Sequence, residues 1–267
     1  MDTIPSVDRL GNSRWQWRVQ RWQRNARSFF DDIRNPGRGS GALTKSLIFL
    51  NLIFFTLMIL QGTAAGLGMR PLLNPDPYLL IHAGAQYWPL VLVEGEWWRC
   101  ITYAFTHGGL IHLAFNMVVL YQVGPLLEFE VGAGRYLFLY TLTALTATIA
   151  GYFWHPAIPV VGASGSLFGL IGFSVVYFHR MGPAGVQIRN FMFQWALFAF
   201  IFGLLVGADN AGHLGGALGG AILGLVLPLS VRARKTFDPI FNVLGSISLA
   251  AIVISLAMLV LSWFGGR

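Results

Sequence analysis

The sequence predicts an all-α polytopic membrane protein, and three observations support that prediction. Of the 267 residues, 55% are hydrophobic and only 11% are charged, whereas an ordinary soluble domain carries about 25% charged residues. The apolar residues gather in stretches of roughly 18 to 25 residues, each long enough to cross a hydrocarbon core. The basic residues fall mainly between those stretches, which leaves no room for a separate soluble domain.

Seven membrane spans are expected, separated by Gly, Pro or charged residues. Their expected ranges are 43–67, 108–127, 133–154, 163–180, 188–208, 210–229 and 239–264. The first loop, residues 68–98, is too broken by proline to cross the membrane and too apolar for an ordinary loop. We therefore expect it to associate with the membrane.

The N-terminal tail, residues 1–42, is polar and basic. Its segment 14–22 places Trp15, Val19 and Trp22 at helical spacing beside arginines. This pattern is typical of a helix lying on an anionic membrane surface, but the composition fits a flexible basic tail equally well. Both interpretations stay open.

The distribution of Lys and Arg predicts a cytoplasmic N-terminus, because cytoplasmic loops carry the excess of basic residues. Of the 18 Lys and Arg residues, fifteen fall in segments placed inside, and the other three are Arg70, Arg99 and Arg267. This orientation puts residues 94–99, residues 155–162 and Asp209 at the outer face. The acidic residues of the tail are atypical of a transit peptide, so we expect a multi-pass protein of the plasma (cell inner) membrane.

Composition also excludes several function classes. The net charge of +7 is dispersed along the chain and forms no single basic face, so no nucleic-acid partner is expected. Cys100 is the only cysteine, which rules out an intramolecular disulfide and a multi-thiolate metal site. There is no His-Glu-x-x-His helix and no pair of carboxylates within the predicted spans, so neither a metal nor another cofactor is expected.

Four polar residues stand out, because polar side chains inside a span are costly and tend to mark function. They are His112, Asn116, Ser164 and His213. The predicted topology places all four toward the outer leaflet. Each alone has an ordinary explanation as a helix cap, a packing residue or an interhelical hydrogen bond.

Glycine spacing favours a functional interpretation of this set. Glycines recur every four residues in the fourth and sixth predicted spans, and small residues at that interval let helix backbones approach closely. They are Gly165 and Gly169 in the fourth span, and Gly212, Gly216, Gly220 and Gly224 in the sixth. If these stripes pack together, Ser164 and His213 could come within about 2.6–3.2 Å, the spacing of an activated nucleophile and its base.

The start of a helix also offers free backbone N–H groups to a developing oxyanion at Ser164. Asn116 and His112, four residues apart on one helical face, would complete that site if the second span faces the fourth. Asp209 is expected to be hydrated at the membrane boundary. We therefore predict a catalytic dyad and not a triad.

Four segments together resemble the rhomboid family of intramembrane serine proteases over roughly residues 94–228. They are Gly95-Glu-Trp-Trp-Arg99, His107-Gly-Gly-Leu-Ile-His112-Leu-Ala-Phe-Asn116, Gly162-Ala-Ser-Gly165 and Ala211-Gly-His213-Leu-Gly-Gly216. The resemblance implies a six-helix catalytic core within residues 43–230, followed in residues 231–267 by an extra seventh span and a short outer C-terminus. It also implies substrates that are single-span membrane proteins, cut near the outer boundary of the lipid bilayer.

The same resemblance implies roles for individual residues. Ser164 would be the nucleophile and His213 its base, with His112 and Asn116 stabilising the oxyanion. Supporting positions would be the motif residue Gly162, the aromatic ring of Phe168 against the catalytic histidine, the structural pair Trp98 and Arg99, and His107 in a hydrogen-bond network or water path.

Two other functions remain to be weighed. A catalytically silent rhomboid-like protein would bind or escort transmembrane clients with the same fold, since a fold alone does not establish catalysis. A channel or transporter is disfavoured, because the four polar residues lie at one depth and no acid or base continues a path through the inner half. The oligomeric state is not predicted.

Overall fold

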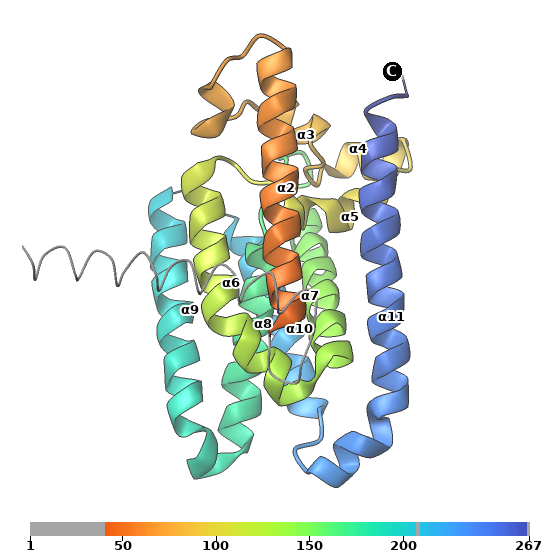
Figure 1. Ribbon diagram of the computed structural model, residues 1–267. Helices are drawn as coiled ribbons and strands as arrows, with labels where there is room; N and C mark the ends of the chain where they lie inside the picture. The colour runs from red at the N-terminus through yellow and green to blue at the C-terminus, as the bar shows by residue number, and fades with distance from the viewer. Residues whose placement is uncertain (1–40, 207–208, 266–267) are drawn as a thin grey trace, which may run out of the picture.

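The computed structural model describes residues 41–206 and 209–265, and these residues form seven long helices and a long connection between the first two. The long helices are α2 (Ala42–Ala64), α6 (Leu110–Val131), α7 (Ala133–Trp154), α8 (Ser164–Arg180), α9 (Val186–Val206), α10 (Asn210–Val226) and α11 (Val231–Ser262). They run alternately up and down, so that the starts of α6, α8 and α10 share the upper end of the bundle in Figure 1. The predicted tail helix at 14–22 lies outside the described residues.

Each long helix coincides with one predicted span, which confirms the all-helical class. Four of them, α2, α6, α7 and α11, are both long enough and apolar enough to cross a membrane. The central helices α8 and α10 have only 17 residues each. The number of spans therefore stays a prediction, while no strand occurs in the described part of the chain.

The connection between α2 and α6, which includes the predicted first loop at 68–98, contains several short helices. They are η1 (Arg70–Leu72), α3 (Pro77–His82), α4 (Trp88–Val93), α5 (Arg99–Thr102) and η2 (Tyr103–Phe105). Arg99 holds this loop together, because its buried guanidinium pairs with Glu96 and donates to the carbonyl oxygens of Ile81 and Ala85. Trp98, the other member of the predicted structural pair, is also buried.

Helices α8 and α10 pack backbone to backbone at the centre of the bundle (Figure 1). A Cβ added at Gly216 would collide with the carbonyl oxygen of Gly165, and one at Gly220 with that of Gly169. The predicted contact through glycine stripes is therefore confirmed. Gly212 is the exception, because the atoms around it belong to Asp209.

Ion pairs tie the helices together at the lower end of Figure 1. Arg234 Nη1 lies 2.9 Å from Glu130 Oε1, and Arg135 Nη1 lies 2.6 Å from Asp238 Oδ1. Two helix ends in this region differ from the predicted spans. Helix α6 extends to Val131 and so includes Glu130, and α11 begins at residue 231, eight residues before the predicted start at 239. The sequence predicts loops here, because charged residues interrupt the apolar stretches. In the structure these charges are paired, and the turns are helical.

Candidate active site

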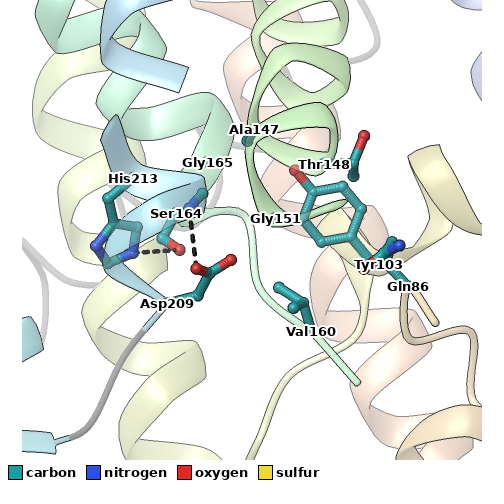
Figure 2. Close-up of a pocket in the computed structure, with 11 residues that line it drawn as sticks. Gln86, Tyr103, Ala147, Thr148, Gly151, Val160, Ser164, Gly165, Asp209 and His213 are labelled. Atoms are coloured by element: carbon teal, nitrogen blue, oxygen red, sulfur yellow. Dashed lines mark hydrogen bonds between the residues drawn. The ribbon is translucent and has the colours of Figure 1, made fainter. Parts of the chain in front are cut away.

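Ser164 begins α8 at the upper end of the bundle, and its hydroxyl is not used to cap the helix. The N-cap is Ala163, with no side-chain hydrogen bond to the first turn. Ser164 Oγ instead lies 2.8 Å from His213 Nε2, the contact drawn in Figure 2. An N-cap role was the ordinary alternative for this serine, and the geometry does not favour it.

His213 lies in the first turn of α10 and is only 6% exposed. Its ring stacks on Phe168, with ring centroids 4.2 Å apart and planes inclined by 16°. Within the described residues, Nδ1 of this ring has no hydrogen-bond partner. One ring nitrogen therefore contacts the serine, and no carboxylate orients the other, which is the geometry of a dyad.

Asp209 lies at the wall of the site and is largely buried. Its side chain is only 17% exposed, and its Oδ1 accepts hydrogen bonds from His155 Nε2 at 2.7 Å and from the Gly212 backbone N–H at 2.9 Å. The sequence predicts a hydrated carboxylate here, whereas the structure also gives it a protein partner, because His155 lies just beyond the end of α7 and contacts it. His155 belongs to no motif and was not predicted to contribute to the site.

His112 and Gly162 bring α6 against the loop that precedes Ser164. Gly162 has φ +116°, and a Cβ there would lie 2.7 Å from Cε1 and 2.8 Å from Nε2 of His112, and 3.8 Å from Ser164 Oγ. The Gly108 backbone N–H donates to His112 Nδ1 at 3.3 Å. Because Nδ1 accepts this bond, a neutral His112 carries its proton on Nε2, the nitrogen that faces the serine loop.

Asn116 is buried one turn further along α6. Its Nδ2 donates to the His112 carbonyl oxygen at 2.9 Å, while its Oδ1 has no hydrogen-bond partner in the described structure. One N–H of the carboxamide therefore remains available.

His107 packs against His112 without joining a hydrogen-bond network with it. It is fully buried, and the two rings meet edge to face with centroids 5.2 Å apart. Among the described residues, no hydrogen bond joins the His107 ring to His112 or Ser164. Burial lowers the pKa of His107 well below its ordinary value of 6.5, so the ring is neutral at neutral pH.

Two cavities meet at the serine. The larger, about 550 Å³, is lined by all four residues of the predicted polar set and has an apolar wall that includes Ile111, Phe115 and Phe202. The smaller, shown in Figure 2, has a volume of about 10 Å³, close to the space of a single water molecule. Ser164, Asp209 and His213 line both.

The smaller cavity is bounded on its far side by Tyr103 and Thr148 (Figure 2). The Tyr103 hydroxyl donates to the Ala144 carbonyl oxygen at 2.9 Å, and burial raises its pKa well above 10.0. This phenol is therefore neutral. Among the described residues, no group of three or more His, Cys, Asp or Glu side chains is arranged to hold a metal ion.

Comparison with known proteins places this site inside a recognised domain. A family model described as the Rhomboid domain matches residues 94–230. The chain is 31% identical over 181 residues to Rhomboid protease GluP of Bacillus subtilis (strain 168), which covers 66% of this chain and 33% of that protein. It is 29% identical over 204 residues to Rhomboid protease AarA of Providencia stuartii, which covers 66% and 69% respectively.

One similar protein is named as inactive. The chain is 27% identical over 152 residues to Inactive RHOMBOID-like protein 8 of Arabidopsis thaliana, which covers 56% of this chain and 43% of that protein. The matches to this protein and to GluP span less than half of each relative's length.

Proposed function

Because the chain belongs to the rhomboid family, we propose that it is an intramembrane serine endopeptidase that uses Ser164 and His213 as a catalytic dyad. The observation that carries this proposal is the 2.8 Å contact between Ser164 Oγ and His213 Nε2 at the wall of a cavity of about 550 Å³. A serine hydroxyl paired with an imidazole is the arrangement of an activated nucleophile.

The chemistry follows from this pair. His213 Nε2 takes the hydroxyl proton while Ser164 Oγ attacks the carbonyl carbon of the scissile peptide bond. The same nitrogen returns the proton to the leaving amine, which leaves an acyl ester on Ser164. A water molecule, deprotonated by His213, then hydrolyses the ester and regenerates the serine.

The negative charge on the tetrahedral intermediate needs donors that are already in place. We assign this role to the Nε2–H of His112, the free N–H of Asn116 and the backbone N–H groups in the first turn of α8. Their support is that His112 and Asn116 line the same cavity as Ser164, and that first-turn amides have no acceptor within their own helix.

The substrates we propose are single-span membrane proteins cut near the outer membrane boundary. The support is topological: seven spans and a cytoplasmic N-terminus would place the starts of α6, α8 and α10 at the outer face of the plasma membrane. A peptide bond in a stable helix keeps its carbonyl in the hydrogen-bond ladder, so the substrate must unwind locally before Ser164 can attack.

Cleavage of a single-span reporter with a destabilised outer helix end tests the proposal. Purified wild type in liposomes should release a product, and Ser164→Ala and His213→Ala should each lower the rate by about three orders of magnitude or more. Matched controls are Ser246→Ala, an exposed hydroxyl bonded only to its own helix, and His179→Ala, an exposed imidazole near the end of α8.

Two outcomes would decide against the dyad. A product that survives Ser164→Ala would exclude Ser164 as the nucleophile. Absence of any product from folded wild type with several reporters would favour the alternative, a silent family member that binds transmembrane clients, and in that case Ser164→Ala would leave client binding intact.

A further inference from the structure

The dyad leaves open what holds the imidazole of His213 in position. In a triad a carboxylate binds the second ring nitrogen and fixes the orientation of the ring. Here Nδ1 of His213 has no partner among the described residues. Phe168 covers one face of the ring, but a stacked ring can still move along that face, so the backbone of α10 must be fixed by other contacts.

Besides the glycine contacts with α8, Asp209 binds the backbone of α10 at its first turn. Its Oδ1 accepts from the Gly212 N–H at 2.9 Å, and its own carbonyl oxygen accepts from the His213 N–H at 3.0 Å. Asp209 is thus the N-cap of α10, and its two bonds go to His213 and to the residue just before it. An N-cap that satisfies these amides determines where the first turn begins.

His155 ties this N-cap to the other half of the site. Its Nε2 donates to Asp209 Oδ1 at 2.7 Å, and the two side chains are only 16% and 17% exposed. The backbone of His155 bonds to α7 through Gly151, and its carbonyl oxygen accepts from Ile158 in the loop that leads to Ser164. One contact therefore joins the segment before the serine to the helix that carries the histidine.

We propose that Asp209 and His155 are positioning residues that together set the distance between His213 and Ser164. The carboxylate acts on the helix that carries the imidazole and not on the imidazole itself. This inference rests on the proposed function. Both side chains also line the larger cavity, so KM can change somewhat. Because a misplacement of about 1 Å at a catalytic group can cost about 100-fold in rate, loosening this contact should lower kcat by a larger factor than it changes KM.

The test measures kcat, KM and the rate of Ser164 labelling by a fluorophosphonate probe for a set of variants. Asp209→Ala and His155→Ala should each lower kcat and the labelling rate about tenfold or more, with a smaller factor of change in KM. Asp209→Asn can cap α10 and still accept from His155, and His155→Gln can still donate, so both should retain most of the rate. Since His155→Ala leaves the cap intact, it tests the proposal even if Asp209→Ala folds poorly.

Coupling and a matched control separate positioning from stability. The double variant Asp209→Ala/His155→Ala should be no slower than the slower single variant, because both changes break one contact. Asp238→Ala removes the ion pair with Arg135 at the opposite end of the bundle. It should lower the thermal midpoint while leaving kcat and the labelling rate at the wild-type level.

Three results would overturn the inference. Wild-type labelling and kcat in both alanine variants would show that the pair does not position the dyad. Full multiplication of the two losses in the double variant would show that the residues act separately. If wild type itself neither cleaves a reporter nor reacts with the probe, the proposed function fails and this inference fails with it. If wild type is labelled and the variants are labelled equally fast, only the inference fails.

Discussion

Gly162 determines how closely the serine loop approaches His112. Its φ of +116° lies in a region that residues with a Cβ rarely adopt, and its N–H donates to the Tyr103 carbonyl oxygen at 2.9 Å. A Cβ at this position would point at the His112 ring, within 2.8 Å of Nε2. The glycine therefore satisfies two separate requirements, a backbone conformation and a close contact between two site residues.

Replacing Gly162 by Ala should reduce cleavage more than it reduces stability. The backbone strain costs of order 1–3 kcal/mol, and the new methyl group must also push the His112 ring away from Ser164. We expect kcat to fall about tenfold or more, because loss of one oxyanion donor, the role proposed for His112, lowers kcat roughly 100-fold or more in comparable enzymes. Reporter cleavage and the thermal midpoint of the same preparation provide the measurement.

Gly182→Ala is the matched control for this change. Gly182 also has a positive φ, +64°, but nothing lies within 4 Å of its added Cβ. An alanine there also has a positive φ, at a smaller cost because +64° lies in the left-handed helical region, and it meets no clash. Equal activity losses in the two alanine variants would contradict a specific role for the space at Gly162.

Residues of the site could be predicted from the sequence where they belong to a short motif. Ser164, His213 and Phe168 meet as expected, because glycine spacing and the resemblance both pointed to them. The pair of His155 and Asp209 could not be predicted, since 54 residues separate its members and only the packing of α7 beside α10 brings them together. A weak signal existed: both residues were expected at the same outer depth.

Helix α11 lies outside the matched Rhomboid domain yet packs closely on the bundle. Its Gly245 meets the backbone of Gly134 at the start of α7, and its Leu259 packs against Gly84 in the first loop. Near its end, Trp263 Nε1 donates to the His82 carbonyl oxygen at 2.8 Å. The helix thus contacts both the start of α7, at the lower end of the bundle, and the upper loop. Its position on one flank of Figure 1 allows both contacts.

Gly245→Leu should therefore destabilise the whole protein. A Cβ at this position would lie 2.6 Å from Gly134 Cα, and since a backbone atom cannot move aside alone, α11 must shift as a unit. Overpacking of this kind costs about 1–3 kcal/mol, which we expect to lower the thermal midpoint by several degrees. Ala250→Leu, on the exposed side of α11, should leave the midpoint within about one degree, because surface substitutions rarely matter.

The order and type of the helices could also be predicted, because apolar stretches separated by charge give a strong signal. The helix ends could not. The start of α11 and the last turn of α6 are polar, and they are helical because Arg234 reaches Glu130 and Arg135 reaches Asp238. Such pairs join residues from different helices, so neither stretch of sequence contains the information alone.

At the scale of the whole molecule, one wall of the larger cavity is formed by aromatic side chains of α6 and α9. Helices α6 and α9 lie side by side at the flank opposite α11 (Figure 1), and aromatic rings fill the space between them. Phe115 of α6 stacks on Phe202 of α9 with centroids 4.5 Å apart, and both residues line the cavity with Ser164. Movement of these rings would open the cavity between α6 and α9, which is the passage we propose for a transmembrane substrate.

Phe202→Ala should therefore speed up cleavage of a membrane-embedded reporter. Removing the ring eliminates the stacked contact that closes α6 against α9, and if separation of these helices limits the reaction, kcat/KM should rise about two- to tenfold, because opening motions limit many turnover rates. Labelling of Ser164 by a small fluorophosphonate should change less than twofold, since that probe needs no helix to separate. Phe200→Ala, an exposed ring on α9, provides the control and should change neither rate. An unchanged or lower kcat/KM in Phe202→Ala, with labelling intact, would place the passage at another face of the bundle.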